Sequence, residues 1–222
     1  MARQSMVIGL GQFGMSLARA LSRQGSEVLA VDIDPKNIAE IAPYVADAVV
    51  MDAMDSEALT ALAPERRDTC VCAIGDENRE GSIIVTALLK QLGAKRIVAR
   101  ATDTLHARIL LLVGAHQIVH PERDVGERLA VQLAWRNVVN VLPLGGELVM
   151  TEVKAPQAFR GQTLASLDLQ RRFRVTVCAI RSDDDASSDA RIPDPHRAIG
   201  ADDILMLVST ADDARELTEK FS

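Results

Sequence analysis

Three glycines near the N-terminus have the spacing of a phosphate-binding turn. The stretch Val-Ile-Gly-Leu-Gly-Gln-Phe-Gly at 7–14 ends an apolar run in a Gly-x-Gly-x-x-Gly pattern, and apolar residues then recur at helical spacing. In such a pattern Gly9 allows a sharp turn after a strand, Gly11 allows the backbone to approach a diphosphate, and Gly14 allows the helix to pack close to the sheet. The free N–H groups and the dipole at the start of that helix favour an anion.

An aspartate completes this chemical signature. Residues 28–31 are predicted to form a second strand, and Asp32 stands at its end, eighteen residues after Gly14. A carboxylate at this place can accept hydrogen bonds from both ribose hydroxyls of an adenosine, and it would repel a 2′-phosphate. The glycine pattern alone is a weak signal, so a domain of the same fold whose loop has lost its ligand is the alternative.

The length and composition restrict the class of protein. The chain has 222 residues, which suits one large domain or a medium domain plus a small one. Its hydrophobic content of 48% is typical of a globular protein, and its net charge of −6 argues against binding nucleic acid or anionic lipid. The longest apolar stretch, 109–115, is far shorter than the roughly 18–20 residues of a membrane span. The first strand is expected to follow the N-terminus directly, which leaves no room for a signal peptide.

Strands and helices are expected to alternate through the first 120 residues. After the first strand, further strands are predicted at 28–31, 48–51, 69–74, 96–100 and 117–119. Helices are predicted to start near Phe13, Asp34 and Asp55 and to cover 82–92 and 103–113. This alternation predicts an α/β fold with a Rossmann-like, doubly wound parallel sheet.

The longest helical pattern covers 122–140. One apolar stripe consists of Val125, Leu129 and Leu133, and a second consists of Val131, Trp135, Val138 and Val139. A helix that is apolar on two sides is expected to pack against two bodies, here its own sheet and a second subunit or domain. A helix buried between two halves of one chain is the alternative.

The pattern changes after Pro143, Gly145 and Gly146, which mark a boundary. Beyond it, strands are predicted at 148–153, 175–180 and 204–208, with a short edge strand at 191–193 and helices at 163–167 and 211–221. The acidic run 182–189 lacks the spacing of a cation site and is expected to form an exposed loop. This part is predicted to be a small α+β domain.

The cysteines and histidines do not suggest a metal or redox centre. Cys70 and Cys72 alternate within one apolar strand and should face the same side of the sheet. Together with Cys178 they are interpreted as small core residues of a reduced, cytosolic protein. The four histidines are scattered over loops and helix faces without a His-x-x-x-His pair, so a structural zinc site is not expected.

These residues resemble the RCK family (regulator of potassium conductance), in particular the cytosolic gating subunits of Ktr/Trk-type potassium transporters. The matching segments are 8–14, 27–34, 71–75, 97–101 and 114–124, followed by 160–164 and 199–205. The stretch Gly-Ala-His-Gln-Ile-Val-His-Pro-Glu at 114–122 is more telling than the glycine turn. The resemblance covers nearly the full length. It implies a nucleotide-binding Rossmann domain at 1–140 and a smaller C-terminal RCK module, for ligand binding or assembly, at 141–222.

The resemblance also implies the residues of the site. It assigns the phosphates to Gly9, Gly11, Gln12, Phe13 and Gly14, the ribose to Asp32 with Ile33 and Asp34 beside it, and the border of adenine and ribose to Asp52, Ala53, Ile74 and Gly75. Arg100 stands where the family often has a lysine near the phosphates. Glu122 corresponds to an acidic residue associated with a divalent cation (Mg or Ca) at the nucleotide. A carboxylate in a first helical turn can also simply interact with the helix dipole.

The function that the resemblance implies is regulatory and not enzymatic. Such proteins form homo-oligomeric rings, commonly octamers built from dimers, in the cytoplasm beneath a potassium-translocating membrane subunit. ATP or ADP binds in the Rossmann domain and changes the shape of the ring. Gln12 replaces the arginine typical of Ktr-type members, so we expect weaker discrimination between ATP and ADP, with NAD(H) as a competitor.

Two other functions are compatible with a Rossmann-like domain. A nicotinamide-dependent oxidoreductase needs a substrate domain that brings an acid or base to the nicotinamide, but the residues after 147 include a single histidine, His196. A free-standing nucleotide sensor would need no channel partner. Cofactor turnover would support the oxidoreductase, and co-purification with a membrane transporter would separate a gating subunit from a free-standing sensor.

Overall fold

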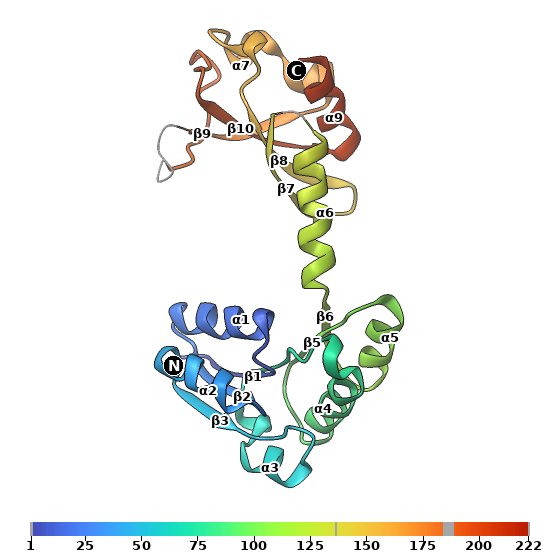
Figure 1. Cartoon of the computed structure of the whole chain (residues 1–222). Helices are drawn as coiled ribbons and strands as arrows, with labels where there is room; N and C mark the ends of the chain where they lie inside the picture. The colour runs from blue at the N-terminus through green and yellow to red at the C-terminus, as the bar shows by residue number, and fades with distance from the viewer. Residues whose placement is uncertain (1, 136, 184–188, 222) are drawn as a thin grey trace. The chain divides into compact units, whose positions relative to one another are not determined.

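The computed structural model describes residues 2–135, 137–183 and 189–221. The chain forms two compact units, which divide between Pro121 and Glu122 (Figure 1). The sequence placed the boundary near residue 140, after the long helix, whereas this helix belongs to the second unit. In the described parts of the chain, no helix has both the length and the apolar character needed to cross a bilayer.

The first unit contains a parallel sheet, with six strands among its described residues in the order β3-β2-β1-β4-β5-β6. The strands are β1 (Gln4–Ile8), β2 (Glu27–Asp32), β3 (Asp47–Val50), β4 (Thr69–Cys72), β5 (Ile97–Arg100) and β6 (Gln117–Val119). This is the predicted Rossmann-like, doubly wound arrangement. The strand order reverses between β1 and β4, and in such sheets ligands bind beyond the carboxyl ends of the strands at that point.

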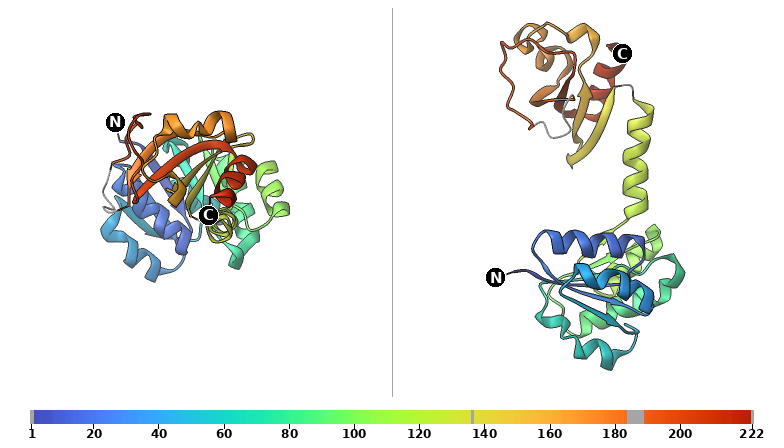
Figure 2. Two further views of the ribbon diagram at one scale, coloured as in Figure 1. Left: turned by 90° about the horizontal axis from the view of Figure 1, so that it is seen from above. Right: turned by 60° about the vertical axis from the view of Figure 1, so that its left-hand side comes forward.

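Helices cover both faces of this sheet (Figure 2). They are α1 (Gln12–Arg23), α2 (Pro35–Ile41), α3 (Ser56–Ala61), α4 (Arg79–Gln91) and α5 (Thr104–Leu112). Neighbouring residues of β1 enter different cores: Val7 packs with residues of α1 and α2, whereas Met6 and Ile8 pack with residues of α3, α4 and α5. Because side chains alternate along a strand, apolar residues on both faces bury the strand completely.

The buried cysteines agree with the sequence prediction, but the third cysteine does not. Cys70 and Cys72 enter the same core, and burial raises the pKa of their thiols to about 12 and about 11. Cys178 is exposed on the second sheet, so its interpretation as a core residue was wrong. Side chains at the start of its strand alternate between exposed and partly buried positions, and Cys178 lies on the exposed face.

The second unit contains α6 (Pro121–Ala134) from its second residue onward and continues into an antiparallel sheet, whose described strands run in the order β7-β8-β10-β9. The strands are β7 (Val138–Gly145), β8 (Leu148–Lys154), β9 (Thr176–Ser182) and β10 (Asp203–Thr210). The helices are α7 (Leu164–Leu167), α8 (Leu169–Phe173) and α9 (Ala211–Lys220). This confirms the small α+β module.

The helix predicted at 122–140 is too long, because its last residues form a strand instead. α6 ends at Ala134, and β7 pairs with β8 through a hairpin at Gly145 and Gly146, both with positive φ. The β-branched run Val138–Val139 suits a strand as well as a buried helix face. The edge strand expected at 191–193 is reduced to a single bridge between Ile180 and Arg191. Most of the acidic loop, at 184–188, lies outside the described residues.

The two apolar sides of α6 have different environments. Val131 and Trp135 pack against the core of the second unit, and a second domain was one of the partners expected for this helix. Val125, Leu129 and Leu133 are 51%, 48% and 79% exposed. Within the described part of the chain, the stripe of Val125, Leu129 and Leu133 is therefore open to solvent.

Candidate nucleotide-binding site

The turn between β1 and α1 is built around two glycines with no room for a side chain. Gly9 has a φ of +89°, which favours glycine, and a Cβ atom on it would lie 2.9 Å from the backbone nitrogen of Ile74. A Cβ atom on Gly14 would lie 1.8 Å from the carbonyl oxygen of Gly9. These contacts hold the turn against the end of β4 and allow α1 to begin directly behind it.

Gly11 differs from these two glycines because the space beside it is open. Its φ of −62° is accessible to any residue, and nothing lies within 4 Å of the position that a Cβ atom would take. Gly11 is the N-cap of α1 and provides no side-chain acceptor, and the first turn of the helix contains no acidic residue. The first N–H groups of a helix have no partner within the helix, so this uncapped end, with open space beside Gly11, suits an anion.

Asp32 lies beside this turn, and the backbone fixes its carboxylate. Oδ2 accepts a hydrogen bond from the N–H of Leu10, within the glycine turn, and Oδ1 accepts one of 2.8 Å from the N–H of Asp34. The side chain is only partly buried. A carboxylate has about four lone-pair sites, so two sites remain for further donors such as ribose hydroxyls.

The residues that follow β2 and β3 border the same edge of the sheet. Ile33 is 66% exposed, whereas Asp34 caps α2 by accepting a hydrogen bond of 2.8 Å from the N–H of Lys36. Asp52 is exposed and accepts a 2.9 Å bond from the N–H of Met54, while Ala53 is 7% exposed. These local bonds shape the two loops at this edge of the sheet.

The ends of β4 and β5 bring a positive charge to this edge. A Cβ atom on Gly75 would lie 2.5 Å from Nη1 of Arg100, so the guanidinium packs directly on the glycine backbone. The side chain of Ile74 contributes to the core and its backbone lies against Gly9. A side chain at position 75 would displace the guanidinium of Arg100 from the β4–α4 turn.

Three other predicted residues have less defined roles. Gln12 is exposed in the first turn of α1. The Phe13 side chain is partly buried and packs against the core. Glu122 is exposed in the first turn of α6, in the second unit, and the described residues contain no group of three His, Cys, Asp or Glu side chains that could hold a metal ion.

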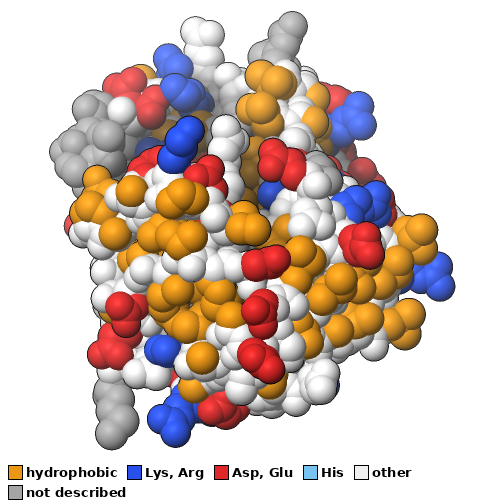
Figure 3. Space-filling model, turned by 60° about the horizontal axis from the view of Figure 1, so that its bottom comes forward, with side chains coloured by type: hydrophobic (Ala, Val, Ile, Leu, Met, Phe, Trp, Pro, Cys, Tyr) orange, Lys and Arg blue, Asp and Glu red, His pale blue; other side chains and the backbone are white. Residues whose placement is uncertain are grey.

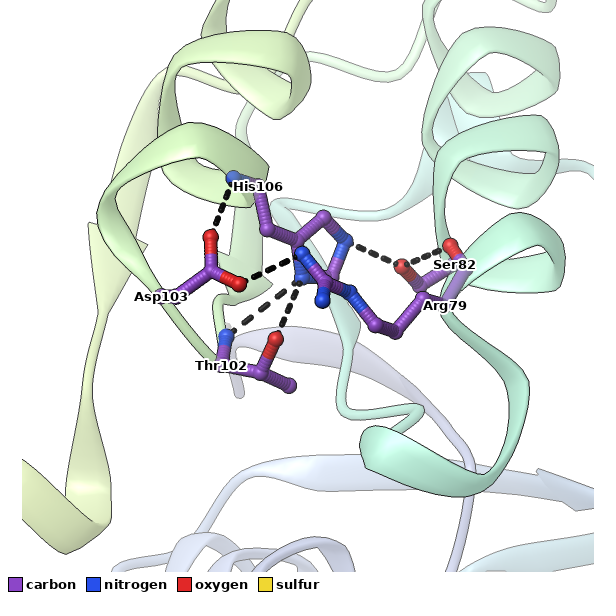
Figure 4. Close-up of polar contacts among 5 residues, drawn as sticks. All are labelled: Arg79, Ser82, Thr102, Asp103 and His106. Atoms are coloured by element: carbon purple, nitrogen blue, oxygen red, sulfur yellow. Dashed lines mark hydrogen bonds and ion pairs between the residues drawn. The ribbon is translucent and has the colours of Figure 1, made fainter.

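One of the four histidines lies on the buried face of a helix. His106 is fully buried at the start of α5, where its Nε2 lies 2.8 Å from Oγ of Ser82 and its Nδ1 lies 3.2 Å from Oγ1 of Thr102 (Figure 4). Asp103 caps α5 and forms a 2.7 Å ion pair with Arg79 of α4. The spacing of the helix cap, Asp103 three residues before His106, was visible in the sequence. The contact of His106 with Ser82, 24 residues away, was not.

Comparison with known proteins identifies both units. The family model described as the TrkA-N domain matches residues 5–121, and that of the TrkA-C domain matches residues 148–222. The chain is 35% identical over 213 residues to the Ktr system potassium uptake protein C of Bacillus subtilis, covering 96% of this chain and 95% of that protein.

Solved structures show the same fold at low sequence identity. The RCK domain of GsuK superposes with a TM-score of 0.68 at 16% identity, over 100% of this chain and 48% of the other. The GsuK channel bound to NAD gives a TM-score of 0.68 at 15% identity, over 100% of this chain and 39% of the channel chain. This chain thus spans less than half the length of either GsuK chain. The resemblance seen in the sequence is confirmed: the chain belongs to the TrkA family, with an N-terminal TrkA-N domain and a C-terminal TrkA-C domain of the RCK fold.

Proposed function

We propose that this protein is a cytosolic regulatory subunit that binds an adenine nucleotide and gates a membrane potassium-translocating subunit of Ktr/Trk type. The observation that carries the proposal is the carboxylate of Asp32, which the N–H groups of Leu10 and Asp34 hold beside the open space at Gly11. The similarity to a Ktr potassium uptake protein supports the transport role. The NAD-bound GsuK channel supports a nucleotide as the ligand.

The geometry supports a particular placement of the nucleotide. The diphosphate would lie over Gly11 and the first N–H groups of α1, with the guanidinium of Arg100 as a positive charge near it. The ribose would donate two hydrogen bonds to Asp32. The remaining predicted residues would line the turn or border the adenosine: Gly9, Gln12, Phe13, Gly14, Ile33, Asp34, Asp52, Ala53, Ile74 and Gly75.

Regulation fits this site better than hydride transfer. An oxidoreductase needs an acid or base that can reach the substrate, yet His106 is fully buried and both of its ring nitrogens have hydrogen-bond partners within the protein. The second unit is matched by a TrkA-C domain. A free-standing sensor without a channel partner remains the second candidate, and the transport experiment below separates the two.

A ring of identical subunits would convert binding into gating. The exposed stripe Val125–Leu129–Leu133 of α6 supports self-association, and Figure 3 shows further hydrophobic side chains on the surface with acidic ones between them. We propose dimers that assemble into an octameric ring. A nucleotide that meets a facing subunit through Gln12, or through a divalent cation (Mg or Ca) at Glu122, would favour one ring shape by its difference in affinity.

The transport role can be tested in cells. The gene is expressed with a Ktr-type membrane subunit in a bacterium that lacks its own potassium uptake systems. The proposal predicts co-purification of the two proteins, potassium uptake that depends on both, and a purified mass by light scattering several times that of one chain. Nucleotide binding by a protein that never co-purifies with a transporter would favour the free-standing sensor.

The identity of residue 12 leads to a prediction about nucleotide preference. Gln12 offers one neutral amide to a terminal phosphate, so the wild-type protein should bind ATP, ADP and NAD(H) with similar affinities. Gln12→Arg should raise the preference for ATP over ADP by about tenfold, since a charged donor is worth about 1–1.5 kcal/mol more than a neutral one. Calorimetric titration with each nucleotide measures this, with the exposed Gln24→Arg at the end of α1 as a control. Strong, exclusive ATP binding by the wild type would contradict the prediction.

A further inference from the structure

Strand β10 of the second sheet is apolar at consecutive positions. Its sequence reads Ile-Leu-Met-Leu-Val at 204–208. An antiparallel strand with one face in water normally alternates apolar and polar residues, whereas a continuous apolar run is typical of a strand that is covered on both faces. Because β10 lies between β8 and β9, this pattern predicts a covering layer on each face of the sheet.

Helices of the same unit cover one of these faces. Leu205 and Leu207 of β10 belong to the buried core of the second unit, together with inward-facing residues of the other three strands. The helices α6, α7, α8 and α9 contribute Val131, Leu167, Phe173 and Leu217 to the same core. The four helices therefore pack on the face to which Leu205 and Leu207 point.

The opposite face also carries apolar side chains. Met206 and Val208 alternate with the core residues of β10. Val208 lies opposite Met150 of β8, and Met150 lies opposite Leu142 of β7. These side chains are partly exposed and lie outside the core cluster, and the neighbouring Leu148 is 47% exposed. We call this surface the outer face: Leu142, Leu148, Met150, Met206 and Val208.

Charged side chains border the outer face at one end and balance each other there. Glu152 and Arg181 form an ion pair of 3.0 Å, and Lys154 and Asp183 form one of 2.6 Å. Ile204 is in register with both Lys154 and Arg181 and is fully buried. These two pairs add no net charge, although the whole chain carries −6. Two copies of the chain would therefore repel each other less here than at an acidic surface.

We propose that the outer face packs against the outer face of a second copy of this chain, so that two sheets lie face to face about a twofold axis. Such a contact needs a surface that is complementary to itself, and an apolar patch bordered by balanced ion pairs meets this requirement. A membrane subunit is a poorer match, because cytoplasmic loops rich in Lys and Arg would favour an acidic surface. The proposal rests on the self-association in the proposed function and assigns a surface to it.

Cys178 of β9 is a native reporter for this contact. Its side chain is exposed, and its Sγ–H donates to the carbonyl oxygen of Met206 at 3.3 Å. The other two cysteines, Cys70 and Cys72, are buried, and burial raises the pKa of their thiols to about 12 and about 11. A maleimide, which reacts with exposed thiolates, should therefore label Cys178 selectively in the folded chain.

The test measures the rate of maleimide labelling of the full chain at constant pH. At about 100 μM the second copy should protect Cys178, and dilution to about 0.1 μM should raise the rate by about tenfold or more. Met150→Glu and Val208→Glu should give the fast rate already at the high concentration, because each would bury an unpaired carboxylate in the contact. A nearby carboxylate disfavours the thiolate, so a faster reaction reports the loss of cover and not a change in reactivity.

Ile192→Glu is the matched control. Ile192 is 89% exposed but follows the bridge between Ile180 and Arg191, outside the outer face. This variant should label as slowly as the wild type at the high concentration. An equal acceleration by Ile192→Glu, or slow labelling that neither dilution nor the two outer-face variants change, would overturn the proposal.

Two further outcomes separate this contact from the proposed function. An oligomeric wild type whose Cys178 reacts fast at every concentration would overturn the contact and leave the proposed ring intact. Protection that appears only when the membrane subunit is added would assign the outer face to that subunit and overturn the pairing of two copies. A single-chain mass by light scattering at every concentration would overturn both the contact and the ring.

Discussion

Gly11→Ala is expected to abolish nucleotide binding and to leave the fold intact. The backbone of Gly11 has dihedral angles that alanine accepts, and its Cβ atom would meet nothing within 4 Å in the free protein. The new methyl group would occupy the space where the diphosphate approaches the first turn of α1. We expect stability to change by about 1 kcal/mol or less, the cost of alanine at an N-cap. Nucleotide affinity should fall by about 100-fold or more, or about 2.7 kcal/mol.

Gly14→Ala is the matched comparison, because it changes the same motif with the opposite effect on the fold. Its Cβ atom would lie 1.8 Å from the carbonyl oxygen of Gly9, a backbone atom that cannot move independently. We expect this variant to be destabilised by about 3 kcal/mol or more, the upper range for forced overpacking. Thermal denaturation and nucleotide titration of both variants measure the contrast. Full nucleotide affinity in folded Gly11→Ala would contradict the assignment of the diphosphate to this turn.

Asp32→Ala is expected to reduce nucleotide affinity by about 100-fold or more, because two charge-assisted hydrogen bonds to the ribose contribute about 1.5–3 kcal/mol each. The substitution also leaves the N–H groups of Leu10 and Asp34 without their acceptor. The free protein should therefore lose about 1–3 kcal/mol of stability. Calorimetry with NAD⁺ and ADP measures the affinity, and denaturation without nucleotide measures the structural part.

Asp55→Ala separates these two effects. Asp55 also accepts two backbone N–H bonds, from Glu57 and Ala58, but it caps α3 and is not among the predicted site residues. Its loss should cost about 1 kcal/mol of stability, as is typical for an N-cap, with unchanged nucleotide affinity. Equal affinities of Asp32→Ala and the wild type would show that the nucleotide does not use this carboxylate.

Much of the first unit was predictable from sequence because its signals are local. The alternation of apolar runs and helical patterns depends on neighbouring residues, and it predicted each strand of the parallel sheet to within a few positions. The turn at Gly9 and the place of Asp32 at the end of β2 also follow from short-range requirements. In the structure, the hydrogen bond from the N–H of Leu10 to Asp32 connects the glycine turn to the end of β2.

The features that sequence did not predict depend on distant partners. Val138 and Val139 continue the helical pattern of α6, but pairing with β8 makes them a strand. His106 shows no chemical pattern by itself, because Ser82 reaches it from another helix. The exposure of Cys178 likewise depends on which face of the second sheet is covered. In each case a long-range contact overrides the local preference.

The most direct test of the central claim is a crystal structure of the protein grown with saturating ADP or NAD⁺. The proposed function requires density for a diphosphate over Gly11 and the first turn of α1, with both ribose hydroxyls within hydrogen-bond distance of Asp32. Density for the nucleotide at another place, with this turn empty, would contradict it.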